Sequence, residues 1–354
     1  MDSVKTNITK ETKNKIVVDY EGKLSVKERL LNKIKASNTW ITAGVSILKF
    51  ILMLGVSFVI IYPFVARIAG SFMTKEDVID STVSLIPKHF TLNIYKAIFI
   101  ENHYVEAFTK TMFLSLACAL VQTFIACLIG YGLAKFRFKG NKLVMGLVVF
   151  TMVIPHSTLS ESMRMHFQSF DLFSLEILGN KGLIELIQNG NSGLNLSNTF
   201  YPFVILSVCG LAFKNGLYIY LMRQFFKGVP DELEESAYVD GSGVFRTFFQ
   251  IIIPLAVPMM ITIFLFSFSW QWTDEFYVDL FFQDTISETH MMPDIYRDIP
   301  TSLDMEMNGY SGTALYTNVI MNTGGMMIIA PLIILYLFCQ KYLVQGIERS
   351  GLVG

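Results

Sequence analysis

Charged side chains are scarce in this sequence of 354 residues. Asp, Glu, Lys and Arg together make up 16% of it, whereas an average soluble domain contains about a quarter. Hydrophobic residues make up 52%, and the mean hydropathy is +0.47. This composition excludes an ordinary soluble domain and indicates an all-α integral membrane protein.

Sequence motifs of enzymes and nucleotide-binding proteins are also missing. There is no G-x-x-x-x-G-K-[ST] to cradle ATP phosphates, and GSGVFR around Gly241 lacks the third glycine of a dinucleotide fingerprint. The histidines occur without H-E-x-x-H, and the four cysteines lie in apolar runs without C-x-x-C spacing. A net charge of −1 gives no reason to expect nucleic acid as a partner. We therefore expect no catalytic residue, no metal site and no bound cofactor on this chain.

No cleavable signal peptide is recognisable in residues 1–40, which mix Lys and Glu without an apolar core. We expect this segment to stay in the cytoplasm. Ser25 and Glu28 have the spacing of a capping box, and an apolar stripe flanked by basic residues follows at 26–35. The stripe predicts a helix on the inner membrane surface, with a solvated charged tail as the alternative.

Long apolar runs predict six transmembrane helices, since about 20 apolar residues cross the hydrocarbon core of a bilayer. The predicted spans are residues 45–69, 111–134, 143–159, 199–221, 251–269 and 323–343. An external segment, 70–107, would follow the first span. Residues 108–345 would then form one transmembrane domain of five helices, and 346–354 a cytoplasmic tail.

Basic residues predict which loops are cytoplasmic. The loop after the second span carries Lys135, Arg137, Lys139 and Lys142. Arg223 and Lys227 follow the fourth span. By the positive-inside rule both loops face the cytoplasm, and six crossings then place both termini there. The expected location is a plasma or inner membrane, with the chain in contact with lipid.

A charged island separates the fourth and fifth spans. Asp231 and Glu234 have the spacing of a capping box, and Leu233, Ala237 and Gly241 fall on one helical face. Residues 230–250 therefore predict a loop outside the membrane with a short helix that Gly241 and Gly243 end. Its small-residue face would fit closely into a cleft of another protein.

This island resembles the EAA loop of membrane subunits of binding-protein-dependent ABC importers. The family pattern is E-A-A, three residues, G, nine residues, I-x-L-P. The matching residues are Glu235, Ala237, Asp240, Gly241, Ile251 and Pro254. Ser236 stands in place of the first Ala and Ile253 in place of the Leu. Both changes are small in volume.

Other segments resemble the carbohydrate branch of this family, and the similarity extends from about Phe90 to the C-terminus. These segments are PKHFTLNIYKAIF at 87–99, KFRFKG after the second span, and GLNLSNTFYPFVIL before the fourth. In KFRFKG, Lys135 stands where the family has Arg. The glycine-rich ending resembles that of the smaller permease subunit of maltose importers.

The resemblance implies the type I ABC importer permease fold and a set of partners. These are a second permease subunit, two ATP-binding subunits that hold ATP and Mg²⁺, and an extracytoplasmic solute-binding protein. Coupling to the ATPase would pass through Glu235, Ser236, Ala237, Asp240 and Gly241. A secondary transporter is the alternative, but neither ion-coupling residues near the midplane nor an inverted repeat is recognisable. A polytopic membrane enzyme ranks third, because paired catalytic residues are missing from the spans.

Polar and aromatic residues within the spans are candidates for the translocation path. Lys214 and Asn215 fall near the middle of the fourth predicted span, where an unpaired charge costs at least about 2.5 kcal/mol. They should line the path or bind a polar group on a neighbouring helix. Trp270 and Trp272 end the fifth span, where they suit either an aromatic belt or stacking on a sugar ring.

Two external segments remain. Residues 171–190 exceed the family pattern and are either a small docking element for an external partner or a tolerated insertion. The loop 278–322 is rich in acidic residues without metal-ligand spacing, which indicates solvated surface. Its acidic residues include Asp279, Asp284, Glu288, Asp294, Asp298, Asp304 and Glu306.

Overall fold

The computed structural model describes residues 9–11, 17–19, 37–171, 193–282, 289–307 and 313–349. The chain divides into two units, Met1–Ala66 and Arg67–Gly354. The first contains an antiparallel pair of short strands, β1 (Thr9–Glu11) and β2 (Val17–Asp19), and most of helix α2 (Ser37–Gly70). The strands are an exception to the predicted all-α class. The surface helix predicted at 26–35 lies outside the described residues.

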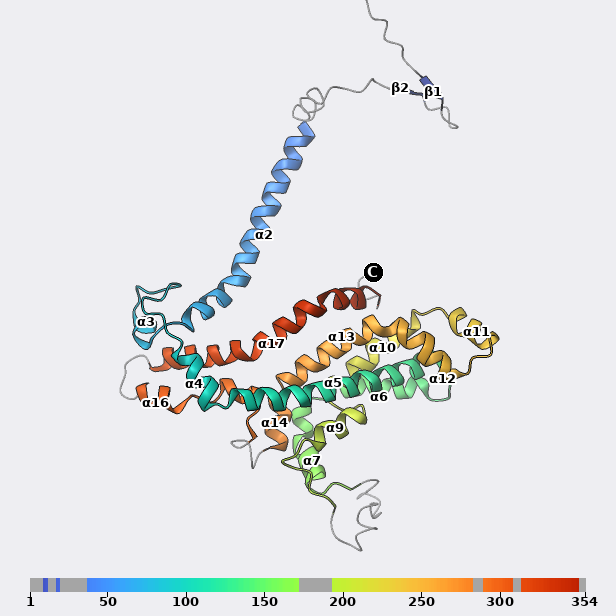
Figure 1. Cartoon of the computed structure of the whole chain (residues 1–354). Helices are drawn as coiled ribbons and strands as arrows, with labels where there is room; N and C mark the ends of the chain where they lie inside the picture. The colour runs from blue at the N-terminus through green and yellow to red at the C-terminus, as the bar shows by residue number, and fades with distance from the viewer. Residues whose placement is uncertain are drawn as a thin grey trace, which may run out of the picture. The chain divides into compact units, whose positions relative to one another are not determined.

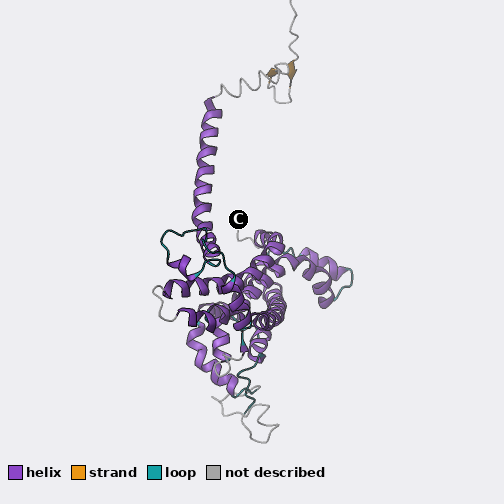
Figure 2. Ribbon diagram, turned by 60° about the vertical axis from the view of Figure 1, so that its left-hand side comes forward, coloured by secondary structure: helices purple, strands orange, loops and turns teal. Residues whose placement is uncertain are grey.

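The second unit is mostly helical in its described residues (Figure 2). Its three longest helices are α5 (Tyr104–Lys135), α13 (Ile253–Trp272) and α17 (Thr313–Arg349). The shorter helices are α3 (Lys75–Ile79), α4 (Asn93–Glu101), α6 (Asn141–Val153), α7 (His156–Gln168), α9 (Tyr201–Val208), α10 (Asn215–Lys227), α11 (Glu232–Val239), α12 (Val244–Thr247), α14 (Glu275–Phe281) and α16 (Thr301–Met307). A π-helical turn, η2 (Phe248–Ile252), precedes α13, and a 3-10 helix, η3 (Met292–Tyr296), precedes α16.

Helix α5 is the centre of this unit. It packs against α9, α10 and α13, and it contributes to each of the three apolar clusters found among the described residues. Gln122, in the middle of α5, donates to Ser207 of α9 (3.1 Å) and accepts from Ser267 of α13 (2.6 Å). Figure 1 shows α11 and α12 at one end of α5, and α4 and α16 at the other. Helix α5 thus connects the two ends of the unit.

Among the described residues, four helices are long and apolar enough to cross a membrane. They are Gly44–Gly70, Tyr104–Lys135, Val244–Trp272 and Thr313–Val344. A fifth candidate is the pair α6 and α7, bent by 100°. The bend corrects the predicted continuous span 143–159. It arises because a residue before proline avoids the helical region, and Ile154, before Pro155, is extended with ψ of 122°.

The predicted fourth span, 199–221, is broken rather than continuous. Helix α9 ends in a Schellman motif: Gly210 has φ of +70°, its N–H donates to Ser207 O, and the N–H of Leu211 donates to Leu206 O (2.9 Å). Lys214 follows with φ of +64°, and α10 begins at Asn215. The sixth predicted span, 323–343, is shorter than the helix that contains it. Helix α17 starts at Thr313 and continues to Arg349, into the predicted tail.

Helices α5 and α10 pack closely because Gly130 has no side chain. A Cβ built there would lie 2.6 Å from Met222 Cβ and 3.0 Å from the backbone nitrogen of Arg223. Backbone atoms cannot move aside as a flexible side chain does. We expect Gly130→Ala to lower the free energy of unfolding by about 1–3 kcal/mol and to reduce the yield of folded protein in detergent. Gly132→Ala is the matched control, because no atom lies within 4 Å of its built Cβ. Equal melting temperatures for the two variants would contradict this packing.

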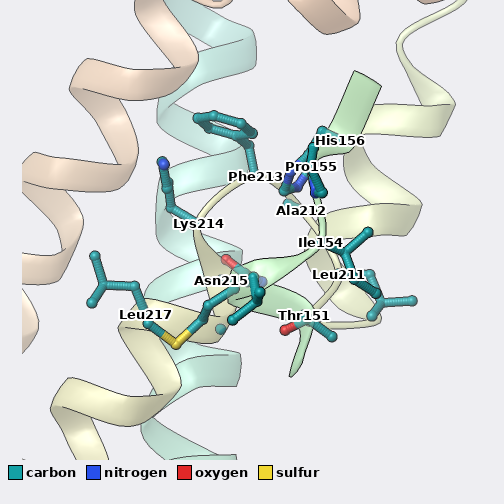
Figure 3. A pocket seen from close by; sticks show the side chains of 14 residues that line it. Thr151, Ile154, Pro155, His156, Leu211, Ala212, Phe213, Lys214, Asn215 and Leu217 are labelled. Atoms are coloured by element: carbon teal, nitrogen blue, oxygen red, sulfur yellow. The ribbon is translucent and has the colours of Figure 1, made fainter. Parts of the chain in front are cut away.

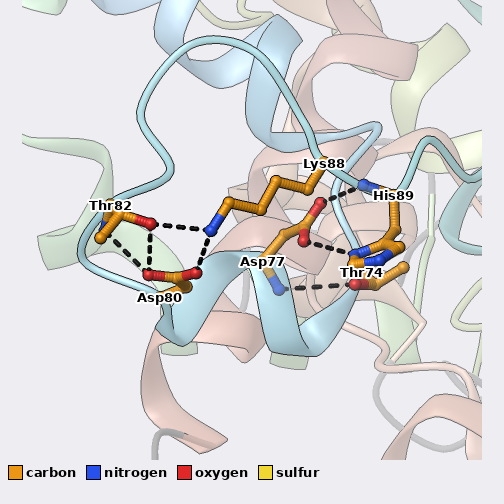
Figure 4. A network of polar contacts seen from close by, with 6 residues as sticks. All are labelled: Thr74, Asp77, Asp80, Thr82, Lys88 and His89. Atoms are coloured by element: carbon orange, nitrogen blue, oxygen red, sulfur yellow. Dashed lines mark hydrogen bonds and ion pairs between the residues drawn. The ribbon is translucent and has the colours of Figure 1, made fainter.

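The segment after α2, predicted to be external, has a compact polar core (Figure 4). Asp77 is buried and accepts a hydrogen bond from the His89 backbone N–H at 2.7 Å. Its Oδ1 lies 2.9 Å from His89 Nδ1. The N–H of His89 and its ring hold the pKa of Asp77 below its usual value. Lys88 binds Asp80 at 2.5 Å and Thr82 at 2.8 Å. Hydrogen bonds and ion pairs thus hold residues 74–89 together as an ordered segment.

The acidic loop after α14 is also more structured than predicted. Arg297 donates two hydrogen bonds to Asp279, at 2.7 and 2.6 Å, and lies 3.8 Å from Asp294. Asp294 is buried and accepts from the Met291 N–H at 2.8 Å. Solvated surface was therefore wrong for Asp294, whereas the Asp279 side chain is ion-paired and still 44% exposed. Exposure was predicted correctly for Asp298, Asp304 and Glu306, while Asp284 and Glu288 lie outside the described residues.

The segment 171–190, predicted as either a docking element or a tolerated insertion, lies almost entirely outside the described residues. The described residues on either side of it meet, because Phe170 and Leu194 exchange backbone hydrogen bonds of 2.9 Å each. Gly193 makes this approach feasible, since a Cβ there would lie only 2.4 Å from Phe170 O. The chain between Phe170 and Leu194 therefore leaves and re-enters the fold at one place.

Candidate functional site

The charged island forms the short helix α11, which begins differently from the prediction and ends in a well-defined motif. The predicted capping box is not formed, since Asp231 has helical φ and ψ and makes no side-chain hydrogen bond to a cap N–H. At the other end Gly241 adopts φ of +81°. Its N–H donates to Tyr238 O (3.0 Å), and the N–H of Ser242 donates to Ala237 O (2.9 Å). This is a Schellman motif, so Gly241 terminates the helix.

Both residues of the predicted capping box bind Lys135 instead, at the end of α5. The Lys135 ammonium lies 2.5 Å from Asp231 Oδ1, 3.4 Å from Glu234 Oε1 and 2.7 Å from the carbonyl oxygen of Val229. The Lys135 side chain is only 8% exposed. Its hydrogen bond to Asp231 holds the pKa of that carboxyl below its usual value. One buried cation therefore ties the start of α11 to the central helix.

Tyr131, one turn earlier on α5, provides a second tie. Its hydroxyl donates to Glu234 Oε2 at 3.0 Å, and both side chains are buried. The Tyr131 ring packs against Phe226 of α10 and Phe248 of η2. Sequence inspection missed this role of Tyr131 and Lys135, although the cluster of cations and the downstream carboxylates were visible in it.

The predicted small-residue docking face does not exist as such. Ala237 is buried within the chain, Leu233 is exposed, and Gly241 lies beyond the helix. The predicted coupling residues Glu235, Ser236 and Asp240 are exposed. Val239 and Phe245 beside them are 87% and 79% exposed. The surface that α11 offers to a partner is therefore acidic with an apolar edge.

The second predicted site, Lys214 and Asn215, lies at the break between α9 and α10. The break lines a cavity of about 330 Å³. Figure 3 shows Phe213, Lys214 and Asn215 along this loop, with His156 from the α6–α7 break across from them. Two interrupted helices thus meet at one cavity. Unwound backbone of this kind is tolerated at membrane depth where it is buried or lines a cavity.

The two predicted tryptophans have different environments. Trp270 is exposed, and the Lys214 ammonium lies 5.1 Å from the centre of its ring. Trp272 is 0% exposed, and its indole N–H donates to Ile328 O at 3.0 Å. Both the belt and the sugar-stacking prediction were therefore wrong for Trp272, whose large ring fills the core between α13 and α17. Trp270 remains a candidate for the path.

A further cluster joins residues distant in the sequence. His103, Glu106 and His290 place one ligand atom each within 4.8 Å of the others, and the two imidazole rings stack at 4.5 Å. Lys110 already binds Glu106 at 2.7 Å and Thr289 O at 2.7 Å. These contacts fasten the loop after α14 to the start of α5, a pairing that residue spacing could not predict.

Comparisons with known proteins agree with this arrangement. The family model described as binding-protein-dependent transport system inner membrane component matches residues 122–349. The chain is 26% identical over 305 residues to protein LplC of Bacillus subtilis (strain 168), covering 85% of this chain and 92% of LplC. It is 27% identical to the galactooligosaccharides transport system permease protein GanQ of the same organism, covering 86% and 94% respectively.

Among solved structures, the chain is similar to one from a bacterial ABC transporter involved in the import of the acidic polysaccharide alginate. The TM-score is 0.63 at 19% identity, covering 90% of this chain and 98% of that chain. The chain therefore has the fold of a type I ABC importer permease and belongs to the family of binding-protein-dependent transport system inner membrane components. It is a membrane permease and not an enzyme.

Proposed function

We propose that this chain is one permease subunit of an ATP-driven importer of sugars or oligosaccharides. Support for the carbohydrate class comes from the resemblance of residues 87–99 to the carbohydrate branch and from the substrate named for GanQ. The partners would be a second permease, two ATP-binding subunits and an extracytoplasmic solute-binding protein. ATP and Mg²⁺ would bind to the ATP-binding subunits.

The observation that carries the proposal is the anchored helix α11. It is a short helix with an exposed acidic face, held to the central helix through the buried Lys135. When the ATPase dimer closes on ATP, a partner bound to α11 would move this helix. Because Lys135 and Tyr131 tie α11 to α5, the movement would pass directly to the helix that contacts both ends of the unit. The cavity would then alternate between the two sides of the membrane.

Six crossings with both termini in the cytoplasm are part of this proposal. The broken pairs α6–α7 and α9–α10 would each count as one crossing, in addition to the four long helices. Lys214, Asn215 and Trp270 would line the translocation path, while Trp272 would support it from the core.

The sidedness can be tested with a single cysteine. We expect a cysteine at Lys139 in a variant without native cysteines to resist an impermeant maleimide applied to intact cells, because its loop carries four cations. The same cysteine should react after the membrane is opened. A cysteine at exposed Lys96 on α4 is the control and should react from outside. Fast labelling at 139 in intact cells would contradict the proposed topology.

The function itself is tested by reconstituting the complete transporter in proteoliposomes and following uptake of radiolabelled oligosaccharides. Uptake should require the ATP-binding subunits, ATP and the solute-binding protein together. A non-hydrolysable ATP analogue should not support it. Uptake driven by an ion gradient without the ATP-binding subunits would overturn the proposal in favour of a secondary transporter.

A further inference from the structure

The cavity at the α9–α10 break contains a buried amide without a partner. Asn215 is 1% exposed and lines the cavity, and neither its Oδ1 nor its Nδ2 has a hydrogen-bond partner among the described residues. Leaving buried polar groups unpaired is unfavourable, because they have lost their hydrogen bonds to water. An amide presents both a donor and an acceptor, as sugar hydroxyl groups also do. A polar ligand with hydroxyl groups would satisfy it.

Lys214 adds a positive charge beside this amide. Its ammonium lies 4.7 Å from the ring centre of Phe213 and 5.1 Å from that of Trp270. Cation–π contacts of this length hold a cation in position without neutralising it. In the described part of the chain no carboxylate lies within ion-pair distance of Lys214 and no hydrogen bond of its ammonium is seen. Its three N–H donors are therefore available to a ligand.

The acidic side chain at the neighbouring α13–α14 junction does not supply the missing partner. Asp274 accepts hydrogen bonds from the Tyr277 N–H (3.0 Å) and from Gln271 Nε2 (3.3 Å). It is the N-cap of α14, so its carboxylate is committed to that helix. The charge of Lys214 thus stays uncompensated next to the cavity, where holding a cation is costly.

We propose that this cavity receives an acidic sugar, such as a uronate residue of an oligosaccharide. Lys214 would bind the carboxylate, and Asn215 would bind ring hydroxyl groups. Trp270 does not line the cavity, but its exposed ring lies 5.1 Å from the Lys214 ammonium, so its fluorescence would respond to a ligand bound there. The volume of about 330 Å³ is at the lower end of the range for small-molecule sites, about 300–1,000 Å³. The cavity therefore takes one sugar residue of a chain at a time. This inference rests on the proposed function and narrows its substrate class.

The test uses the complete transporter in nanodiscs and the fluorescence of Trp270. The ligands are trigalacturonate and its methyl ester, which share a skeleton and differ in charge. We expect trigalacturonate to shift the fluorescence at concentrations about tenfold lower than the ester, since one charge-assisted hydrogen bond is worth at least this factor. Trp270→Phe should abolish the signal, which assigns it to this site.

Lys214 variants separate substrate binding from a structural role. Lys214→Met should weaken binding of trigalacturonate about tenfold and leave the ester unchanged, while Lys214→Arg should retain most of the binding. Lys96→Met, which removes an exposed lysine elsewhere, should change neither. Loss of both ligands together, or loss of the permease pair on purification, would show that Lys214 pairs with a carboxylate of the second permease.

Failure of this inference is distinguishable from failure of the proposed function. Equal binding of acid and ester by the wild-type transporter, or binding of neither, would overturn the acidic-sugar site. ATP-dependent uptake of a neutral oligosaccharide in the same preparation would still support the importer. An absence of ATP-dependent carbohydrate uptake in every form would overturn the proposed function instead.

Discussion

Replacing Lys135 by methionine is expected to abolish ATP-driven uptake while leaving the chain inserted in the membrane. The Lys135 ammonium contacts Asp231, Glu234 and the Val229 carbonyl, and its side chain is 8% exposed. Methionine has a similar length but no charge, so Glu234 would be left buried without its cation. Removing one partner of a buried ion pair costs about 3–5 kcal/mol. Helix α11 would detach from α5 before the apolar contacts of the spans are affected.

The measurement is paired with two control variants. Lys135→Arg keeps the charge and should retain part of the uptake, since arginine occupies this place in the family pattern. Lys139→Met removes a cation from the same loop at an exposed position and should leave uptake close to the wild-type level. Capture of the ATP-binding subunit from detergent extract should fail for Lys135→Met alone.

An opposite result would be informative. If Lys135→Met supports normal uptake and captures the ATP-binding subunit, then the contacts of Lys135 with α11 do not transmit motion. If instead Lys135→Met and Lys139→Met both fail, the loop acts through its total positive charge and its sidedness. Protein level in the membrane must be measured for each variant so that poor insertion is not mistaken for poor coupling.

Apolar runs predicted the long helices well, because a span of lipid-facing residues needs only length and hydrophobicity. Helices α5 and α17 contain their predicted spans, and η2 and α13 together contain the fifth. The prediction failed where a single residue interrupts the backbone inside an apolar run. Pro155 forces Ile154 out of the helical region, and Gly210 allows α9 to end in a left-handed turn. Proline and glycine at these places were the available signals.

The candidate site could be predicted only in part. The position of α11 between two spans follows from local sequence, as does its exposed acidic face. The partner of its carboxylates does not, because Lys135 and Asp231 lie 96 positions apart and meet only when α5 and α10 pack together. The lysine was interpreted as a marker of sidedness, whereas it is buried. Trp272 shows the same limit, since residue type alone does not reveal that α17 covers it.

The left-handed backbone at Gly241 leads to the second large effect, expected for Gly241→Val. With φ of +81° the residue lies in a region that costs a non-glycine residue about 1–2 kcal/mol, and a β-branched side chain suffers most. No atom lies within 4 Å of a built Cβ, so the cost arises from backbone strain and not from a clash. The hydrogen bonds of Gly241 and Ser242 to α11 would be weakened, and the end of α11 would unwind.

We therefore expect Gly241→Val to reduce uptake and capture of the ATP-binding subunit by about 5- to 30-fold, the factor that one or two kcal/mol produces. Gly241→Asn should be nearly silent, because asparagine tolerates the left-handed conformation. Gly243→Val is the matched control: Gly243 is extended, with φ of −78°, and its built Cβ also meets no atom within 4 Å. If asparagine at 241 is as harmful as valine, the bare surface of Gly241 contacts the ATPase. If valine is harmless at both positions, the end of α11 does not take part in coupling, and the contacts with Lys135 alone must hold the helix in place.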